Sequence, residues 1–492
     1  MQFTRLVYRG LVVLTIIGSV ALWGICLQRT YHAVTAPQSA PGVAVTTGCE
    51  EESLYAIWRV AHGQPAYRDT AVPPYASAYF NWLFYSTYGR VAAVMLNEHD
   101  QAQLPVISRC WTFIGALGGT IMLSCFAWQQ FQRRGRACAF AAVFIACFCF
   151  LGPLPGWWIC TTRPDIWALT FELLGLLLFL HFQRQQPWQA VFLAALCFYA
   201  AWAMKPNFIQ AICGTTLFLL TQRRWRHVLT LITLTCGAYI ITLLTLGTTY
   251  QKALLETATS NQFLFGIVQD NTTSAALRIL PILVLCALCL FHLRHQRWRD
   301  LPDAARLALG SLPVAITITL LTCGKVGASN NYYLTTSLLL TIAGLSLAAH
   351  SARTAYFLTP SVVIAISLLF AVLGGKGQTN LRGQNEILAA RWQLWQDAPE
   401  PRFSHDLRLN LPWLNPHTPP FVLAFNYPQD RKHGRHFFED GIGGLISRGY
   451  FAALLLPESA VSEYDGAALS GYHPKSAAAG YVLLIRNSEP SN

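Results

Sequence analysis

Charged side chains are scarce in this chain of 492 residues. Asp, Glu, Lys and Arg together make up 12% of it, whereas hydrophobic residues make up 53%. Large soluble enzymes rarely have so little charge, and apolar runs long enough to cross a bilayer recur from Leu11 to Leu373. These features predict an all-α polytopic membrane protein.

Two further features are missing from the sequence. No cysteine follows Cys323, so the C-terminal part of the chain has no means of forming disulfides. The phosphate-binding P-loop is absent as well, because Gly324-Lys325 lacks the upstream glycine and the following Ser or Thr of that motif. The sequence therefore does not predict a P-loop nucleotide site.

The apolar runs predict about eleven transmembrane helices. We place them at Leu11–Leu27, Pro105–Phe131, Ala137–Trp158, Pro164–Phe182, Trp188–Met204, Asn207–Leu220, Val228–Leu246, Ala275–Leu293, Leu307–Cys323, Tyr332–Ala349 and Ala355–Leu373. The fifth and sixth spans are short and share the break Lys205-Pro206-Asn207. Because arginines flank both outer ends of that pair, we expect a tight hairpin rather than one long helix.

Arginine clusters occur in alternate connections between the predicted spans. They are Arg5 and Arg9; Arg133, Arg134 and Arg136; Arg184; Arg223, Arg224 and Arg226; Arg294, Arg297 and Arg299; and Arg353. The positive-inside rule then predicts a cytoplasmic N-terminus and an extracytoplasmic C-terminus. The net charge of +12 is explained mainly by this topology signal, so a nucleic-acid partner is not predicted.

Two predicted external regions are long enough to fold. The loop 28–104 has helical character from Glu50 to His62, and its aromatic residues predict a second, interfacial helix from Tyr75 to Tyr88. The tail predicts a small α/β domain, with strands at Phe421–Phe425, Tyr450–Leu456 and Tyr481–Ile485, a helix at Phe438–Ser447 and an irregular Pro399–Pro420 segment. We therefore divide the chain into a transmembrane domain, 1–373, which includes the loop, and an extracytoplasmic domain, 374–492.

Three consecutive carboxylates, Glu50, Glu51 and Glu52, stand at the head of the predicted loop helix. Charges are costly next to a bilayer, and clustered carboxylates raise one another's proton affinity, so one of them could act as a general base. The alternative is a solvated acidic start of a helix, which the helix dipole would favour.

Three cations, Arg163, Lys205 and Lys325, lie at predicted outer ends of spans with few charges nearby. Cations so placed suit a phosphate group whose negative charge grows during a reaction. Lys205 is the strongest candidate, because a cation in a proline-broken hairpin at membrane depth needs a partner or a water-filled cavity. The alternatives are a local Arg163–Asp165 pair and lysines that extend toward the interface.

Three polar residues near these cations are candidates for binding a substrate. Asp165 follows a proline in the first turn of a span, where the carboxylate could instead be structural. Asn331 and Tyr332 open the tenth span and could hydrogen-bond a sugar or phosphate, or serve as turn and interface residues.

Metal ligands are not predicted. Asp430, His433, His436 and Glu439 recur at intervals of three, but Gly434 and the loop setting favour a solvated polar run. No Asp-x-Asp of the kind used with metal-bound nucleotide sugars occurs in the sequence.

Several segments resemble the membrane glycosyltransferases of the GT-C superfamily, which include protein O-mannosyltransferases, aminoarabinose transferases of lipid A and lipopolysaccharide-core sugar transferases. The similar segments are Glu50–Arg59, Gly63–Asp69, Thr162–Asp165, Lys205–Asn207, Gly327–Leu334 and Ile446–Leu455. In order and sidedness the resemblance covers most of the chain. It implies a GT-C-like arrangement of the helices and a multi-pass protein of the plasma membrane, here the bacterial inner membrane.

The resemblance also implies an activity, the transfer of a hexosyl or pentosyl group from a polyprenyl-phosphate donor to a glycan, lipid or protein acceptor at the extracytoplasmic face. An acidic residue of the first loop would be the catalytic base or orient the acceptor, and outer cations would hold the lipid phosphate. Three glutamates after Cys49 replace the usual Asp-Glu pair, and we favour Glu51, with Glu52 next and Glu50 third. No cofactor is predicted, and a role for a divalent metal is left open.

A lipid transporter or flippase is the alternative from another class. It would use the same cations as a substrate path, but it would typically carry paired internal repeats with broken helices in both halves. The sequence has one broken hairpin and no clear repeat. A third hypothesis is an assembly factor without activity.

Overall fold

The structure of the protein is a computed structural model, which describes residues 2–35, 50–97, 100–259, 262–351, 362–369, 383–421, 427, 431, 434–459 and 469–487. The chain forms two compact units. The helical unit comprises Met1–Thr30, Trp111–Thr245 and Gln262–Gly377. The mixed unit comprises Tyr31–Cys110, Leu246–Asn261 and Gln378–Asn492.

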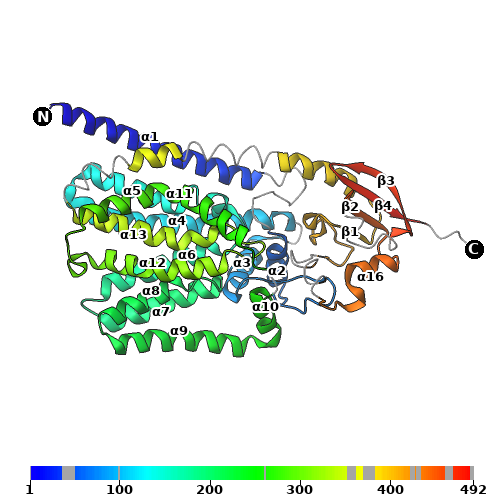
Figure 1. Ribbon diagram of the computed structural model, residues 1–492. Helices are drawn as coiled ribbons and strands as arrows, with labels where there is room; N and C mark the ends of the chain where they lie inside the picture. Colours follow the sequence, from blue (N-terminus) through cyan, green and yellow to red (C-terminus); the bar gives the residue numbers. More distant parts are fainter. Residues whose placement is uncertain are drawn as a thin grey trace, which may run out of the picture. The chain divides into compact units, whose positions relative to one another are not determined.

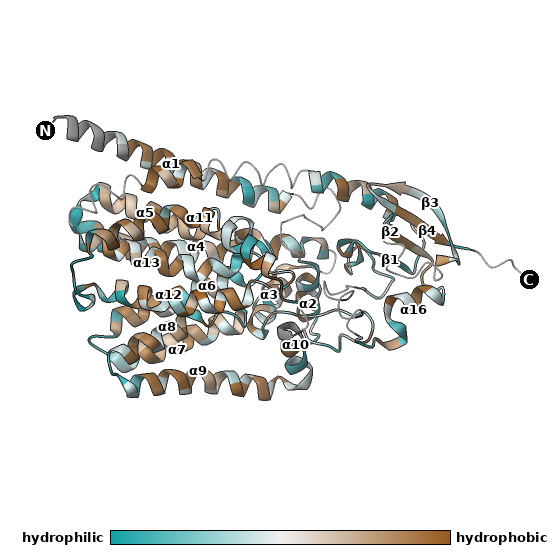
Figure 2. Ribbon diagram, in the orientation of Figure 1, coloured by the Kyte–Doolittle hydropathy of each residue, from teal (hydrophilic) through white to brown (hydrophobic). Residues whose placement is uncertain are grey.

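The helical unit consists of long apolar helices, which Figure 2 colours largely brown. In the described residues, eight helices of the chain are long and apolar enough to cross a membrane, and Arg136–Leu151 and Gln210–Thr221 are shorter apolar helices. The predicted class, a polytopic all-α membrane protein, is confirmed. The long and the shorter apolar helices are α1 (Gln2–Thr35), α4 (Leu104–Phe131), α5 (Arg136–Leu151), α6 (Asp165–Phe182), α7 (Pro187–Met204), α8 (Gln210–Thr221), α9 (Trp225–Thr245), α11 (Phe265–His292), α12 (Asp303–Thr322) and α13 (Leu334–His350).

These ten helices correspond in order to the first ten predicted spans. Two of them, α5 and α8, are shorter than a full span, with 16 and 12 residues. The eleventh predicted span, Ala355–Leu373, lies outside the described residues except for a helical stretch at 362–369. Neighbouring helices of this unit, such as α6 and α7 or α12 and α13, pack along one another (Figure 1).

The predicted break between the fifth and sixth spans is confirmed. Helix α7 ends at Met204 and α8 begins at Gln210. Lys205 has extended backbone angles, φ −145° and ψ 121°, as expected of a residue that precedes proline. Pro206 has no N–H for the helix ladder, so the chain turns here. Lys205 therefore lies in the short non-helical connection between α7 and α8.

Close packing of α6 on α7 depends on Gly175. A Cβ atom at this position would lie 2.6 Å from Phe198 Cε1, so a larger residue would push the two helices apart. The start of α6 and the end of α7, which carry Asp165 and Lys205, are held together by this packing.

In the described residues, the mixed unit contains three short helices before residue 260, a helical stretch at 383–395 and a small domain with a sheet. The helices are α2 (Glu51–Ala61), α3 (Trp82–Met95) and α10 (Gly247–Thr259). The loop helix predicted from Glu50 to His62 is therefore confirmed. The helix predicted at Tyr75–Tyr88 is displaced, because Asn81 caps the backbone N–H of Trp82 and α3 starts there.

The described part of the tail forms a four-stranded sheet with the order β1-β2-β4-β3, accompanied by α16 (Gly441–Ser447). Its strands are β1 (Arg402–Ser404), β2 (Ala453–Pro457), β3 (Tyr472–Ala478) and β4 (Tyr481–Arg486). The first pair is parallel and the others are antiparallel. The predicted small α/β domain is confirmed, although β1 lies in the segment predicted as irregular and β3 was not predicted. Residues 422–425 of the predicted Phe421–Phe425 strand lie outside the described part.

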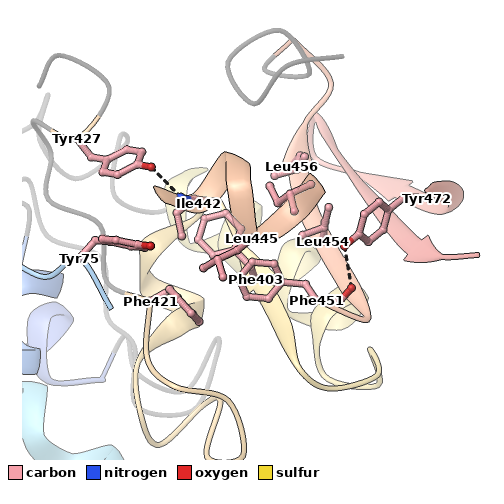
Figure 3. Packing of buried hydrophobic residues seen from close by; sticks show 11 residues of the cluster. Tyr75, Phe403, Phe421, Tyr427, Ile442, Leu445, Phe451, Leu454, Leu456 and Tyr472 are labelled. Carbon is pink, nitrogen blue, oxygen red and sulfur yellow. Dashed lines mark hydrogen bonds between the residues drawn. The ribbon is translucent and has the colours of Figure 1, made fainter. Parts of the chain in front are cut away.

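Aromatic and aliphatic side chains form the core of the mixed unit, and Tyr75 of the first loop belongs to it (Figure 3). Tyr75 is 1% exposed, packs against Phe421 and Tyr427, and donates a hydrogen bond of 2.8 Å to the carbonyl of Phe438. The backbone N–H of Phe438 in turn bonds the carbonyl of Ala71. The loop and the tail thus share one compact unit, and the division at residue 373 stays a prediction.

Candidate functional site

Four candidate residues of the helical unit meet in one buried cluster. The Lys205 ammonium lies 2.6 Å from Asp165 Oδ1, and the Asn331 amide donates to the same oxygen at 2.7 Å. Lys205 also lies over the ring of Tyr332, 5.0 Å from its centroid. Asp165 is fully buried, and the side chains come from the start of α6, the break after α7 and the residues before α13. The sequence named each residue, and the structure brings them together.

Two acceptor atoms of the cluster accept no hydrogen bond from the described residues. Among the described residues, Asp165 Oδ2 and Asn331 Oδ1 are buried and accept no hydrogen bond. Leaving such atoms unsatisfied in an apolar environment is costly, and their chemistry matches a hydroxyl or amine donor. The cluster therefore has acceptor capacity beside its cation.

Arg163 lies two residues before Asp165 but does not form the local pair that we considered as an alternative. Its guanidinium lies over the ring of Trp158, 5.9 Å from the centroid, and its positive charge acts on Lys205. Two cations and the single carboxylate of Asp165 thus lie near one another. Two formal positive charges against one formal negative charge suit an anion.

The third predicted cation, Lys325, belongs to a different local structure. It forms an isolated antiparallel bridge with Phe263, flanked by backbone bonds from Leu264 to Gly324 and from Val326 to Gln262. Partial burial lowers the pKa of its ammonium. The backbone of Lys325 is held by that bridge, and a role of its side chain in binding phosphate stays a prediction.

A buried carboxylate that the sequence reasoning missed is Glu172 of α6. It is 1% exposed, accepts a hydrogen bond of 3.1 Å from the backbone N–H of Ala211, and accepts another of 2.5 Å from the Thr335 hydroxyl. The signal was present in the sequence, because an acidic residue inside an apolar span marks a functional candidate.

The glutamates of the first loop lie in the mixed unit, and their surroundings differ. Both oxygens of Glu50 accept from the guanidinium of Arg109, with the Nε bond at 3.2 Å. Arg109 is 1% exposed and also donates to the carbonyl of Ala33 at 2.9 Å. This bidentate buried pair gives Glu50 a structural partner.

Glu51 begins α2 and is half-buried, whereas Glu52 is buried. Burial raises the pKa of the Glu51 carboxyl, and the charge of Glu50 adds to the rise, while the charge of Arg408 opposes it. The repulsion between clustered carboxylates that we expected is therefore present, but burial is the larger cause.

Arg408, from the tail, is itself held by a carboxylate. It donates to Asp406 through Nε at 2.7 Å and Nη2 at 2.6 Å, and Arg391 donates to Asp406 at 3.0 Å. Burial alone would raise the pKa of the Asp406 carboxyl, but the hydrogen bonds and charges of the two arginines lower it overall. Arg408 is thus fixed in a position from which its charge acts on Glu51.

The four-residue polar run of the tail lies partly outside the described residues, which exclude Asp430 and His433. Of the others, Glu439 pairs with Arg448 at 2.9 Å. Within the described part of the chain, no group of three or more His, Cys, Asp or Glu side chains is arranged to hold a metal ion.

Comparison with known proteins gives no match among protein-family models and none among curated sequences. Solved structures do match. ArnT from Cupriavidus metallidurans bound to undecaprenyl phosphate aligns with a TM-score of 0.58 at 11% identity, covering 94% of this chain and 97% of that one. The apo state of the same protein aligns with a TM-score of 0.54 at 12% identity and the same coverage.

A third structure, the Archaeoglobus fulgidus oligosaccharyltransferase in complex with Zn and sulfate, aligns with a TM-score of 0.53 at 12% identity, covering 96% of this chain and 73% of that one. At these identities the likeness concerns the fold. The expected GT-C-like architecture is therefore confirmed, for a multi-pass membrane protein with a small mixed domain.

Proposed function

We propose that this protein is a membrane glycosyltransferase that moves a sugar from a polyprenyl-phosphate donor to an acceptor at the extracytoplasmic face. The observation that carries the proposal is the buried cluster of Lys205, Asp165, Asn331 and Tyr332 at the broken hairpin of a GT-C-like fold. ArnT, which shares that fold, was solved with undecaprenyl phosphate, and this supports a lipid-phosphate donor here.

The cations of the cluster would bind the lipid phosphate. Lys205 acts as a point charge and Arg163 as a planar fork, and both suit phosphate oxygens. Burial strengthens their attraction for an anion, and the carboxylate of Asp165 keeps the ammonium of Lys205 in place when no lipid is bound. Lys325 is a weaker candidate for the same role, because it lies in a separate backbone bridge with Phe263.

The sugar would use the acceptor atoms of the same cluster. Asp165 Oδ2 and Asn331 Oδ1, which accept no hydrogen bond within the described residues, match the hydroxyl groups that every sugar carries. Tyr332 adds an aromatic face beside Lys205. A phosphate oxygen would be repelled by these acceptors, so they favour the sugar end of the donor.

Glu51 would be the general base. Burial raises the pKa of its carboxyl, so the carboxylate binds a proton more tightly, as a general base must. Glu50 is engaged by Arg109, and Glu52 is buried, which favours Glu51 among the three. Glu52 remains the second candidate.

The reaction balances with these groups. The acceptor oxygen attacks the anomeric carbon and forms the new C–O bond, while the bond from that carbon to the phosphate oxygen breaks and its electron pair leaves with polyprenyl phosphate. The proton of the acceptor hydroxyl passes to the Glu51 carboxylate. The growing phosphate charge is compensated by Lys205 and Arg163.

The test is turnover of purified protein in lipid nanodiscs with a panel of undecaprenyl-phosphate sugars and envelope acceptors, read as release of undecaprenyl phosphate. Glu51→Gln should lower kcat by about 10²-fold or more, the usual contribution of a general base. Lys205→Met should raise KM for the donor. Glu458→Gln is the matched control, because Glu458 is exposed.

Two outcomes would contradict the proposal. One is that no donor of the panel releases undecaprenyl phosphate. The other is that Glu51→Gln and Glu52→Gln both keep wild-type turnover. Movement of intact lipid across the bilayer without sugar transfer would instead support the transporter alternative.

A further inference from the structure

We propose that Glu172 is a positioning residue that sets the place of Lys205 and Asn331, and so the affinity for the lipid-phosphate donor. The inference rests on the proposed function, and none of the candidate roles given above includes Glu172. It follows from two layers of hydrogen bonds that join the same parts of the helical unit.

The upper layer is the cluster around Asp165. Its carboxylate binds Lys205, which follows α7, and Asn331, which precedes α13. The lower layer is centred on Glu172, seven residues further along α6. Seven residues are close to two full turns, so the two carboxylates lie on one face of the helix, about 10 Å apart along its axis.

Glu172 contacts the same two segments as Asp165, a few residues further along each of them. Glu172 Oε1 accepts from the N–H of Ala211 in the first turn of α8, six residues after Lys205. Glu172 Oε2 accepts from Thr335, four residues after Asn331. The non-helical stretch between α7 and α8 is therefore fixed to α6 at both of its ends.

The first turn of α8 needs such a partner. The N–H groups of the first turn of a helix have no acceptor within the helix, and Ile209, at the N-cap, provides no side-chain bond. Glu172 supplies an acceptor from another helix, and the positive end of the α8 dipole favours a carboxylate there. The break that places Lys205 thus depends on Glu172 as well as on Pro206.

A carboxylate does this better than an apolar residue of similar size. Its two oxygens accept simultaneously from α8 and from α13, so both segments are held at fixed positions relative to α6. If either bond is lost, the segment that it holds is released, together with Lys205 or Asn331. Burial at 1% exposure makes the loss costly, since the partners would be left unsatisfied.

Replacement by glutamine separates positioning from proton chemistry. In Glu172→Gln, the amide oxygen still accepts from Ala211 and the amide nitrogen can donate to the Thr335 hydroxyl, so the geometry survives without the charge. In Glu172→Leu both bonds are lost. Thr335→Val removes the α13 bond alone and serves if Glu172→Leu does not fold. Thr341→Val is the matched control, because the Thr341 hydroxyl donates to the carbonyl of Ser337 in its own helix rather than to Glu172.

The kinetic experiment measures kcat and KM for the undecaprenyl-phosphate sugar that the wild type turns over best. We expect Glu172→Leu, which loses two buried hydrogen bonds, to raise KM about tenfold or more. Thr335→Val, which loses one, should raise KM a few-fold. In both variants kcat should stay within about threefold of the wild-type value. Glu172→Gln and Thr341→Val should stay within about threefold of wild type in both constants. A fall in kcat in Glu172→Gln as large as in Glu172→Leu would overturn the positioning role, as would unchanged KM in both Glu172→Leu and Thr335→Val.

A second measurement needs no substrate. Lys205 is acylated with an amine-directed reagent and the modified peptide is quantified by mass spectrometry. Labelling should rise in Glu172→Leu and Thr335→Val and stay unchanged in Glu172→Gln. If the wild type is active but labelling and KM do not change, the inference fails and the proposed function stands. If no sugar is transferred but labelling rises as expected, the proposed function fails and the control of Lys205 by Glu172 holds.

Discussion

The buried pair of Lys205 and Asp165 gives the sharpest prediction. Lys205→Met leaves the Asp165 carboxylate without its cation in a site where Asp165 is fully buried and the Lys205 side chain is 8% exposed. Among the residues that the structure describes, Asp165 would keep the hydrogen bond from Asn331 alone. Because a buried charge without its partner is strongly unfavourable, we expect Lys205→Met to lower the free energy of unfolding by about 3–5 kcal/mol. Asp165→Asn should cost a similar amount.

The double variant is the informative one. When Lys205→Met and Asp165→Asn are combined, neither charge remains, so we expect the double cost to be smaller than the sum of the single costs by about 1–3 kcal/mol. The assay is equilibrium unfolding in mixed detergent micelles, followed by loss of helical circular dichroism. Arg184→Met provides a control from a pair in which Arg184 is 75% exposed, where we expect a cost of about 0–1 kcal/mol.

Additive single costs, equal to the double cost within about 0.5 kcal/mol, would refute the reasoning, because additivity is what independent sites show. Equal costs for Arg184→Met and Lys205→Met would also refute it, since burial is the stated cause of the difference. In either case Lys205 would be bound to Asp165 too weakly to be held in place by it, and the phosphate role would need another explanation.

Three further predictions concern the mixed unit. If Glu51 is the base, kcat should rise with pH as its carboxyl loses a proton. Because burial raises the pKa of that carboxyl, the midpoint of the pH–rate profile should lie above the range of an exposed glutamate. Arg408→Met removes the charge that opposes this rise, so it should move the midpoint higher still. Glu50→Gln should lower the free energy of unfolding by about 3–5 kcal/mol because it leaves the buried Arg109 without its counter-charge; circular dichroism during denaturation checks this. Tyr75→Phe should cost about 0.5–1.5 kcal/mol for the lost hydrogen bond, whereas Tyr75→Ala should cost about 3–5 kcal/mol for the cavity.

Each of these three predictions has a contrary result. If Arg408→Met leaves the pH–rate profile unchanged, the charge of Arg408 does not act on Glu51. Wild-type stability in Glu50→Gln would mean that the ion pair is not a structural one. Equal costs for the two substitutions of Tyr75 would contradict a role of its ring in the core.

Much of the fold could be predicted because membrane spans are local features of the sequence. Ten of the predicted spans correspond in order to observed helices, since a run of apolar residues of bilayer length is enough to mark a span, although the bounds differ by several residues. The break at Lys205 could be predicted for the same reason, because proline acts on its immediate neighbours. The sheet was predicted only in part, since β1 and β3 are short or polar and gain their bonds from partner strands.

The candidate residues were identifiable from the sequence, but their partners were not. A charge inside or next to an apolar span can be recognised in the sequence, and this indicated Lys205, Asp165 and the three glutamates. Glu172 carried the same signal and was passed over. Which charge binds which is a matter of distance in space: Asp165 pairs with Lys205, forty residues away, and not with Arg163, two residues away. Likewise Glu50 pairs with Arg109.

The sequence by itself determined that this chain lies in a membrane, in which order its apolar helices follow one another, and which few side chains carry charge there, because hydropathy and proline act locally. Only the tertiary structure decided that Lys205 and Asn331 share one oxygen of Asp165, that Glu172 joins α8 to α13, and that Tyr75 packs with the tail. These contacts depend on helices and loops far apart in sequence being brought within hydrogen-bond distance, which no local pattern encodes.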